Sequence, residues 1–96
     1  MAEKHFYVVV YDISNDKRRV RLHKRLQDYG SPVQFSVFEC LLEEDRYQAM
    51  MNMIQKTIKP RKDQVRIYFL CESCLQKVWT SNASSEIVQD VNSIIV

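Results

Sequence analysis

A continuous apolar run that ends in a carboxylate is the feature that most constrains how this chain folds. Residues 6–11 are all aromatic residues or valine, and Asp12 follows these six positions of unbroken β-favouring sequence. A run of this composition and length is typical of a strand buried on both faces. Ser14 or Asn15 is then a suitable N-cap for a helix. The sequence therefore predicts a carboxylate at the end of a central strand, directly before a helix.

The predicted helix is unusually rich in cations. Between residues 17 and 25 lie Lys17, Arg18, Arg19, Arg21, Lys24 and Arg25, although the whole chain has a net charge of only +2. The first three occupy the first helical turn, where the helix dipole disfavours positive charge. We therefore expect an anion nearby, and the predicted nucleic-acid contacts from this helix are Lys17, Arg18, Arg19, Arg21 and Arg25. A solvated helix face is the alternative interpretation.

The hydrophobic periodicity predicts three strands and two helices before the tail. The strands fall at about residues 5–13, 33–42 and 64–71, and the helices at about 16–29 and between Glu43 and Pro60. Gly30 is expected to end the first helix in a left-handed conformation. Residues 77–80 could form a further short strand. The pattern predicts an α+β fold, the ferredoxin-like βαββαβ sandwich, with an antiparallel sheet and two helices on one face.

A chain of 96 residues is long enough for one domain. We expect a ferredoxin-like domain over residues 1–80 and a C-terminal tail, 81–96, that packs on its own subunit or on a partner's. No apolar stretch approaches the ~20 residues that a membrane-spanning helix needs. The N-terminus lacks a signal-peptide pattern, so a cytoplasmic protein is expected.

Asp12 is the leading candidate for chemistry. A carboxylate can bind Mg²⁺, which in proteins usually takes one or two carboxylates, several waters and substrate phosphate oxygens. A twofold dimer that brings two copies of Asp12 together would supply two, and the metal could then activate a water. The simpler interpretation is an Asp that caps the helix or pairs with an arginine. Glu39 is a second candidate acid, while Tyr11 and Ser36 could bind phosphate.

The histidines and cysteines give weaker signals. His5 and His23 are weak candidates for a general base. Cys71 and Cys74 form one C-x-x-C motif, for which a zinc site would need two further ligands. Packing is therefore the preferred interpretation of these cysteines.

Taken together, these motifs resemble the Cas2 family of small CRISPR-associated proteins of spacer acquisition. The resemblance rests on residues 7–16, the arginines at 18, 19 and 21, the pair 29–30, Gln34 and the segment 36–40, and it covers about the first 70 residues. It implies a magnesium-dependent endonuclease that acts on RNA or double-stranded DNA. It also implies a homodimer, in which a C-terminal strand adds to the partner's sheet, and a complex with the CRISPR integrase subunit.

The resemblance also implies roles for individual residues. The family's metal-binding and catalytic Asp falls on Asp12, so that one Mg²⁺ per dimer would be shared by two copies. Its important arginines fall on Arg19 and Arg21, and its Ser and Phe fall on Ser36 and Phe38. Tyr11 and Phe38 are expected to support the site. A non-catalytic dimeric DNA-binding scaffold and a toxin ribonuclease of the VapD type are the alternatives.

Overall fold

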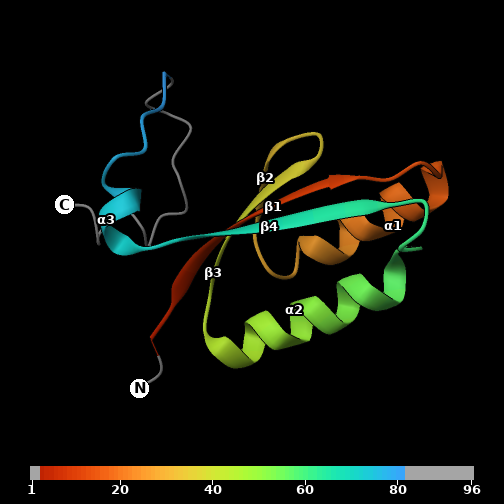
Figure 1. Cartoon of the computed structure of the whole chain (residues 1–96), viewed down its shortest axis with the longest axis horizontal. Helices are drawn as coiled ribbons and strands as arrows, with labels where there is room; N and C mark the ends of the chain where they lie inside the picture. Colours follow the sequence, from red (N-terminus) through yellow and green to blue (C-terminus); the bar gives the residue numbers. More distant parts are fainter. Residues whose placement is uncertain (1–2, 82–96) are drawn as a thin grey trace.

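The computed structural model describes residues 3–81 and shows a four-stranded sheet covered on one side by two helices (Figure 1). The elements are β1 (His5–Asp12), α1 (Asp16–Leu26), β2 (Ser31–Gln34), β3 (Val37–Leu42), α2 (Glu44–Thr57), β4 (Gln64–Leu70) and α3 (Glu72–Leu75). The strand order is β2-β3-β1-β4, and every neighbouring pair is antiparallel. The predicted ferredoxin-like α+β fold is therefore confirmed.

The two long helices pack on the sheet through short apolar stripes. Leu22 and Leu26 of α1, one turn apart, are fully buried, as are Met50 and Ile54 of α2. Asn15 caps α1 through its side chain, which accepts a hydrogen bond from the Arg18 backbone N–H at 2.9 Å. The core between the layers is completed by Ile13, directly after β1, and by buried residues of the strands: Tyr7, Val9, Tyr11, Phe38, Cys40 and Leu42.

The prediction that β1 is buried on both faces is wrong, because the described helices α1 and α2 cover only one face of the sheet. Tyr7, Val9 and Tyr11 point toward the helices and are buried, whereas Val8 and Val10 point the other way and are only half-buried. The register of the ladder places the partners of these two valines on the same side. We call this side the open sheet face; it contains the following residues of β1, β3 and β4: Phe6, Val8, Val10, Asp12, Val37, Glu39, Leu41, Gln64, Arg66, Tyr68 and Leu70.

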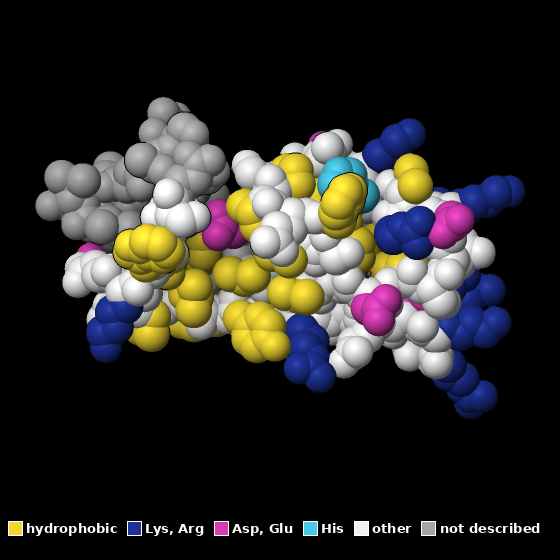
Figure 2. Space-filling view, turned by 90° about the horizontal axis from the view of Figure 1, so that it is seen from above, with side chains coloured by type: hydrophobic (Ala, Val, Ile, Leu, Met, Phe, Trp, Pro, Cys, Tyr) yellow, Lys and Arg dark blue, Asp and Glu magenta, His cyan; other side chains and the backbone are white. Residues whose placement is uncertain are grey.

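Figure 2 views the molecule from the side away from α2. Hydrophobic side chains gather in a band across the middle of this view, and Lys and Arg side chains gather at one end of it. On the open sheet face the described apolar residues other than Phe6 remain partly accessible, and Tyr68 is 49% exposed. A sheet face that leaves apolar side chains accessible beyond a short covering helix is typical of a protein–protein contact.

The predicted single strand over residues 33–42 is instead a hairpin. β2 and β3 pair with each other, and Phe35 and Ser36 form the connection between them. Within β3 the alternate residues Phe38 and Cys40 are buried, while Phe35 is 97% exposed at the tip of the hairpin. A strand over residues 77–80 is also absent from the structure, and the short helix α3 precedes that segment instead.

Gly30 is needed for space and not for a left-handed backbone, because its φ is not positive. A Cβ atom at this position would overlap the Glu39 carbonyl oxygen and would lie 2.5 Å from the Cys40 Sγ. The chain after α1 therefore lies directly against β3. The first helix ends at Leu26, three residues before its predicted end, and the Gly30 N–H still donates to the Leu26 carbonyl at 3.0 Å.

Within residues 3–81, no helix has the length and apolar character needed to cross a membrane. The expectations for the C-terminal tail fall on residues 82–96 and so lie outside the described residues. The proposed division at residue 80 likewise stays a prediction.

Candidate nucleic-acid and metal site

Asp12 is exposed at the last position of β1. It pairs with Gln64 of β4, while its neighbours Tyr11 and Ile13 are both buried on the helix side. Strand alternation therefore directs the Asp12 side chain to the open sheet face, on the same side as Val8 and Val10. The sequence correctly predicted a carboxylate that leaves the core at the end of a central strand.

The loop after Asp12 is held by a buried carboxylate that the sequence analysis did not single out. Asp63, in the connection between α2 and β4, has a fully buried side chain and a bidentate ion pair with Arg18, at 2.7 Å to Nε and 3.0 Å to Nη2. It also accepts hydrogen bonds from the Lys59 N–H at 2.9 Å and from the N–H and hydroxyl of Ser14. We call this group the Asp63 clamp.

The clamp explains part of the positive charge on α1. The Arg18 guanidinium, together with backbone N–H donors, holds the pKa of the Asp63 carboxyl well below its usual range. The charge of Arg18 is therefore compensated inside the chain, and its predicted role in nucleic-acid binding stays a prediction with a competing structural role. Residues 14 and 63 are far apart in sequence, so no local pattern could indicate this contact.

The other predicted cations divide into two groups. Arg25 donates to the Thr57 hydroxyl at 2.8 Å and so connects α1 with α2. Arg19 pairs with the exposed Asp16 at 2.6 Å and donates to the Ile13 carbonyl at 3.5 Å, so its side chain returns over the end of β1. For Lys17 and Arg21 the described part of the chain offers no ion pair, and Arg21 is exposed.

Tyr11 is a positioning residue and not a free phosphate ligand. Its hydroxyl donates to the Phe35 carbonyl at 3.0 Å and lies 3.1 Å from His23 Nδ1. A tyrosine hydroxyl has one proton, so His23 must donate through Nδ1, which leaves Nε2 as its second polar atom. Burial raises the pKa of Tyr11. The hydroxyl therefore stays protonated at neutral pH and attaches the hairpin tip to α1.

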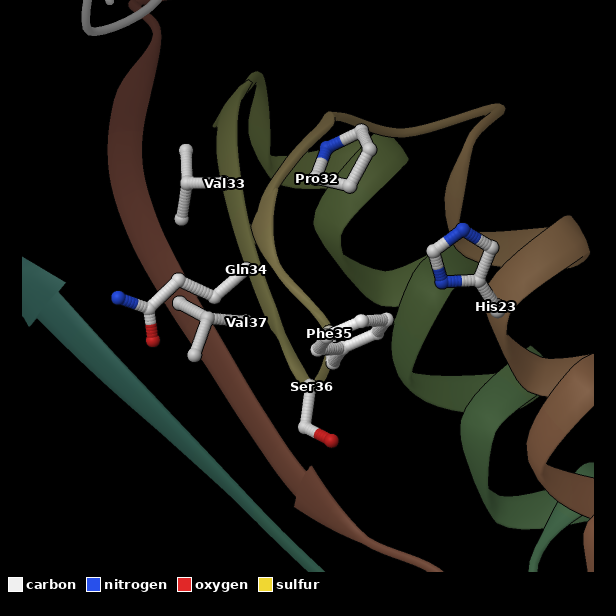
Figure 3. A pocket seen from close by; sticks show the side chains of 7 residues that line it. All are labelled: His23, Pro32, Val33, Gln34, Phe35, Ser36 and Val37. Carbon is white, nitrogen blue, oxygen red and sulfur yellow. The ribbon is translucent and has the colours of Figure 1, made fainter.

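The hairpin tip and α1 together form a basic hollow of about 300 Å³. Its lining is Tyr11, Arg19, Val20, His23, Lys24, Phe35 and Ser36, which includes two permanent cations and no carboxylate. Figure 3 shows the His23 ring on α1 opposite Phe35, with Ser36 at the end of the turn. A shallower hollow of about 720 Å³ continues over the other residues of the hairpin. Ser36 therefore lies in a turn beside cations, a position that suits a phosphate contact.

Phe38, predicted to support the site, is fully buried beneath this hollow. The edge of the His23 ring packs against it with 5.0 Å between ring centroids, and the Tyr11 ring lies 6.4 Å away. The side chain thus fixes the two residues that hold the hairpin tip. Phe35 was not predicted as a site residue, because the sequence predicts a continuous strand over residues 33–42 and gives no sign of a turn there.

A single chain does not complete a metal site among residues 3–81, which contain no group of three acidic, histidine or cysteine side chains able to hold a metal ion. Glu39 pairs with Val8, four residues before Asp12 along β1, which separates the two acids by about 13 Å at the usual strand rise. Burial raises the pKa of Glu39. Because β3 is an inner strand, Glu39 does not lie at the sheet edge. Asp12 thus fits a hard cation only if another molecule supplies further oxygen ligands.

The predicted general bases lie far from each other. His5 packs edge-on against Phe69 at the start of β1, with ring centroids 5.3 Å apart. It is therefore at the opposite end of β1 from Asp12. His23 lies in the basic hollow, where its Nδ1 is already bonded to Tyr11.

These features define a class: small ferredoxin-like proteins that present an acid at the end of β1 beside a basic helix. The comparison with known families then gives the family itself. The model of the family described as CRISPR associated protein Cas2 matches residues 5–78. The chain belongs to the Cas2 family, and the resemblance seen in the sequence is confirmed.

Similar proteins carry related descriptions. The chain is 43% identical over 74 residues to a CRISPR-associated endoribonuclease Cas2 of Chloroflexus aurantiacus, a match that covers 76% of this chain and 80% of that protein. The crystal structure of Streptococcus pyogenes Cas2 at pH 6.5 is 28% identical, with a TM-score of 0.70 over 80% of this chain and 99% of that one. A chain of a partial Cas6-RT-Cas1–Cas2 complex is 26% identical, with a TM-score of 0.68 over 88% of this chain and 97% of that one. These matches favour the CRISPR hypothesis over a VapD-type toxin.

Proposed function

We propose that this protein is a CRISPR-associated, metal-dependent endonuclease that hydrolyses phosphodiester bonds of RNA or double-stranded DNA during spacer acquisition. The observation that carries the proposal is the exposed Asp12 at the end of the open sheet face, beside the start of the basic helix α1. The endoribonuclease name of the Chloroflexus relative supports the activity. A cytoplasmic location and the CRISPR integrase subunit as partner complete the proposal, the latter supported by the Cas1–Cas2 complex among the structural relatives.

The active form in this proposal is a homodimer joined through the open sheet face. In a twofold interface the same patch meets itself, so an apolar face with Asp12 on one side of it can bring two copies of Asp12 close together. The partly exposed Val8, Val10 and Tyr68 would then be buried, which provides a hydrophobic driving force of about 25 cal/mol per Å².

Two Asp12 carboxylates from two chains fit the ligand set that Mg²⁺ takes in phosphate-processing sites, where waters and substrate oxygens complete the shell. When bound, one shared Mg²⁺ per dimer would supply charge neutralisation and an acidified water. Lys17, Arg19 and Arg21, together with Ser36 at the hairpin turn, would hold the phosphate backbone on either side of the scissile bond. Phe35 would add an aromatic surface for a base.

Cleavage assays with RNA and duplex DNA in the presence of Mg²⁺ test the activity, with Asp12→Asn compared to wild type. We expect the variant to lose cleavage while it keeps nucleic-acid binding. Asp28→Asn, an exposed acid at the other end of α1, is the matched control and should cleave as wild type does. Equal cleavage by the Asp12 variant and wild type, or no cleavage by either with any divalent metal, would contradict an endonuclease.

A non-catalytic DNA-binding scaffold is the second candidate, favoured by the structural match to a chain of a Cas1–Cas2 complex. It predicts that Asp12→Asn still assembles with the integrase and DNA, whereas the double variant Arg19→Gln, Arg21→Gln binds DNA weakly. The slope of log affinity against log salt should fall by about one for each lost phosphate contact. Unchanged affinity and slope in the double variant would contradict both the endonuclease and the scaffold, because each needs phosphate contacts from these arginines.

A further inference from the structure

Cys71 and Cys74 lie outside the core, so the interpretation of this pair as packing residues is wrong. Both follow β4 directly, at the beginning of the short helix α3, and both side chains are exposed and reduced. Cys40, in contrast, is buried under the helices. The described part of the chain also brings no third ligand to this pair with which it could hold a metal ion. Any function of this pair must therefore come from the reactivity of the two thiols themselves.

The two sulfur atoms face each other. Cys71 Sγ is 3.5 Å from Cys74 Sγ and 3.2 Å from the Ser73 hydroxyl. The Ser73 hydroxyl, followed by the groups of Cys74, lowers the pKa of the Cys71 thiol to about 7. The pKa of Cys74 is raised, chiefly by its side-chain hydrogen bond with Cys71. A thiolate forms readily at Cys71 near neutral pH, with a second thiol within bonding reach.

The third thiol, that of Cys40, is buried and unreactive, unlike the exposed thiol of Cys71. Burial, with a contribution from the neighbouring Glu39, raises the pKa of Cys40 to about 12. Gly30 and Met50 lie directly against it in the core. Cys40 is therefore inert in the folded protein, and it serves as an internal reference for the exposed pair.

We propose that Cys71 and Cys74 form a redox-active dithiol that is converted reversibly into an intramolecular disulfide by exchange with low-molecular-weight disulfides. The Cys71 thiolate attacks one sulfur of the small disulfide, forms a mixed disulfide and releases one small thiolate. Cys74 then loses its proton to solvent and attacks the Cys71 sulfur, which releases the second small thiolate. Two protein thiols are oxidised, one small disulfide is reduced, and the two protons that the cysteines lose match those that the two released thiolates take up.

The position of the pair gives the bond a structural consequence. Leu75, the neighbour of Cys74, is buried against Phe6, and Val8, Leu41 and Leu70 pack around these two residues. A bond between residues 71 and 74 would fix the turn from which Leu75 reaches the sheet. Oxidation would thus restrain the one described element that covers part of the open sheet face.

The test uses the full chain, reduced and then equilibrated without oxygen in glutathione buffers of increasing oxidised fraction. Free thiols are trapped with a maleimide after acid quenching, and the intact mass is measured. We expect two of the three cysteines of wild type to become unavailable to the maleimide together. The protein itself should become two hydrogens lighter and should carry no glutathione adduct. Added dithiothreitol should restore both sites.

Three variants make the result specific. Cys74→Ser should stop at a glutathione adduct on Cys71, whereas Cys71→Ser should react with glutathione disulfide roughly fivefold or more slowly at pH 7, because the attacking thiol has lost its low pKa. Cys40→Ala should behave as wild type. Accumulated glutathione adducts on wild type, disulfide-linked dimers, or three unreactive thiols would each overturn the proposal. None of these readouts depends on nuclease activity or nucleic-acid binding.

Discussion

Replacement of Asp63 by Asn should destabilise the protein far more than replacement of any exposed acid. The Asp63 carboxylate is fully buried and accepts five hydrogen bonds, from Ser14 (two), Arg18 (two) and Lys59 (one). Loss of its charge leaves the Arg18 guanidinium, which is only 13% exposed, without an anion. Breaking a buried pair in this way costs about 3–5 kcal/mol. We take the lower end, about 3 kcal/mol, because an amide keeps some of the hydrogen bonds.

Chemical and thermal unfolding measure this effect. A loss of about 3 kcal/mol corresponds to a fall in Tm on the order of 10–20 °C for a domain of this size. Asp16→Asn is the matched control, since its ion pair with Arg19 is exposed and is worth about 0–1 kcal/mol. Double variants with Arg18→Met isolate the pair itself, because removal of both charges should cost less than the sum of the single changes.

The change of the unfolding free energy with pH tests the same contribution of Asp63 to stability. The pKa of Asp63 is lower in the folded protein than the value near 3.9 that an unfolded chain has, so its stabilising effect is complete above that value and is lost as the pH falls. The difference in unfolding free energy between wild type and Asp63→Asn should be constant from pH 7 to 5 and shrink below about pH 4. Equal stability of the Asp63 and Asp16 variants at pH 7, or a difference that grows on acidification, would refute the reasoning.

Three further predictions follow from single contacts. Gly30→Ala should lower stability by about 2 kcal/mol or more in urea unfolding, because its Cβ would overlap β3. An unfolding midpoint equal to that of wild type would show that β3 can shift to make room for the methyl group. Tyr11→Phe should lower the free energy of unfolding by about 1 kcal/mol, since the Phe35 carbonyl loses its donor, and should broaden the NMR signals of the hairpin tip. Unchanged spectra would show that the Tyr11 hydroxyl does not order the hairpin. Val10→Glu should convert the proposed dimer into a monomer in sedimentation experiments, and a persistent dimer would place the interface elsewhere.

The parts of the fold that could be predicted from the sequence are those with local signals. The apolar run and its terminal carboxylate located β1, and the cap at Asn15 located the start of α1 within one residue. The resemblance to the Cas2 family was likewise carried by short segments near these elements. Local chemistry was sufficient here because one strand and one helix start contain most of the candidate site.

The misses arose where the structure depends on contacts between distant segments. The turn at Phe35 and Ser36 contains no Gly, Asn or Asp, so the usual hairpin signal is missing and the sequence predicts one strand where the structure has two. The Arg18–Asp63 pair joins residues 45 positions apart, and only the fold brings them together. The exposure of Cys71 depends on α3, which is too short for a periodicity signal.

Because side chains alternate along β1, the position of Asp12 in the sequence decides which face of the sheet carries its carboxylate. Val8, Val10 and Asp12 share one side only because they are separated by even numbers of residues. A one-residue insertion or deletion between Val10 and Asp12 would turn the acid toward the helices while the two valines kept their place. The spacing in this strand can therefore change only in steps of two if the carboxylate is to stay on the side from which a second chain approaches.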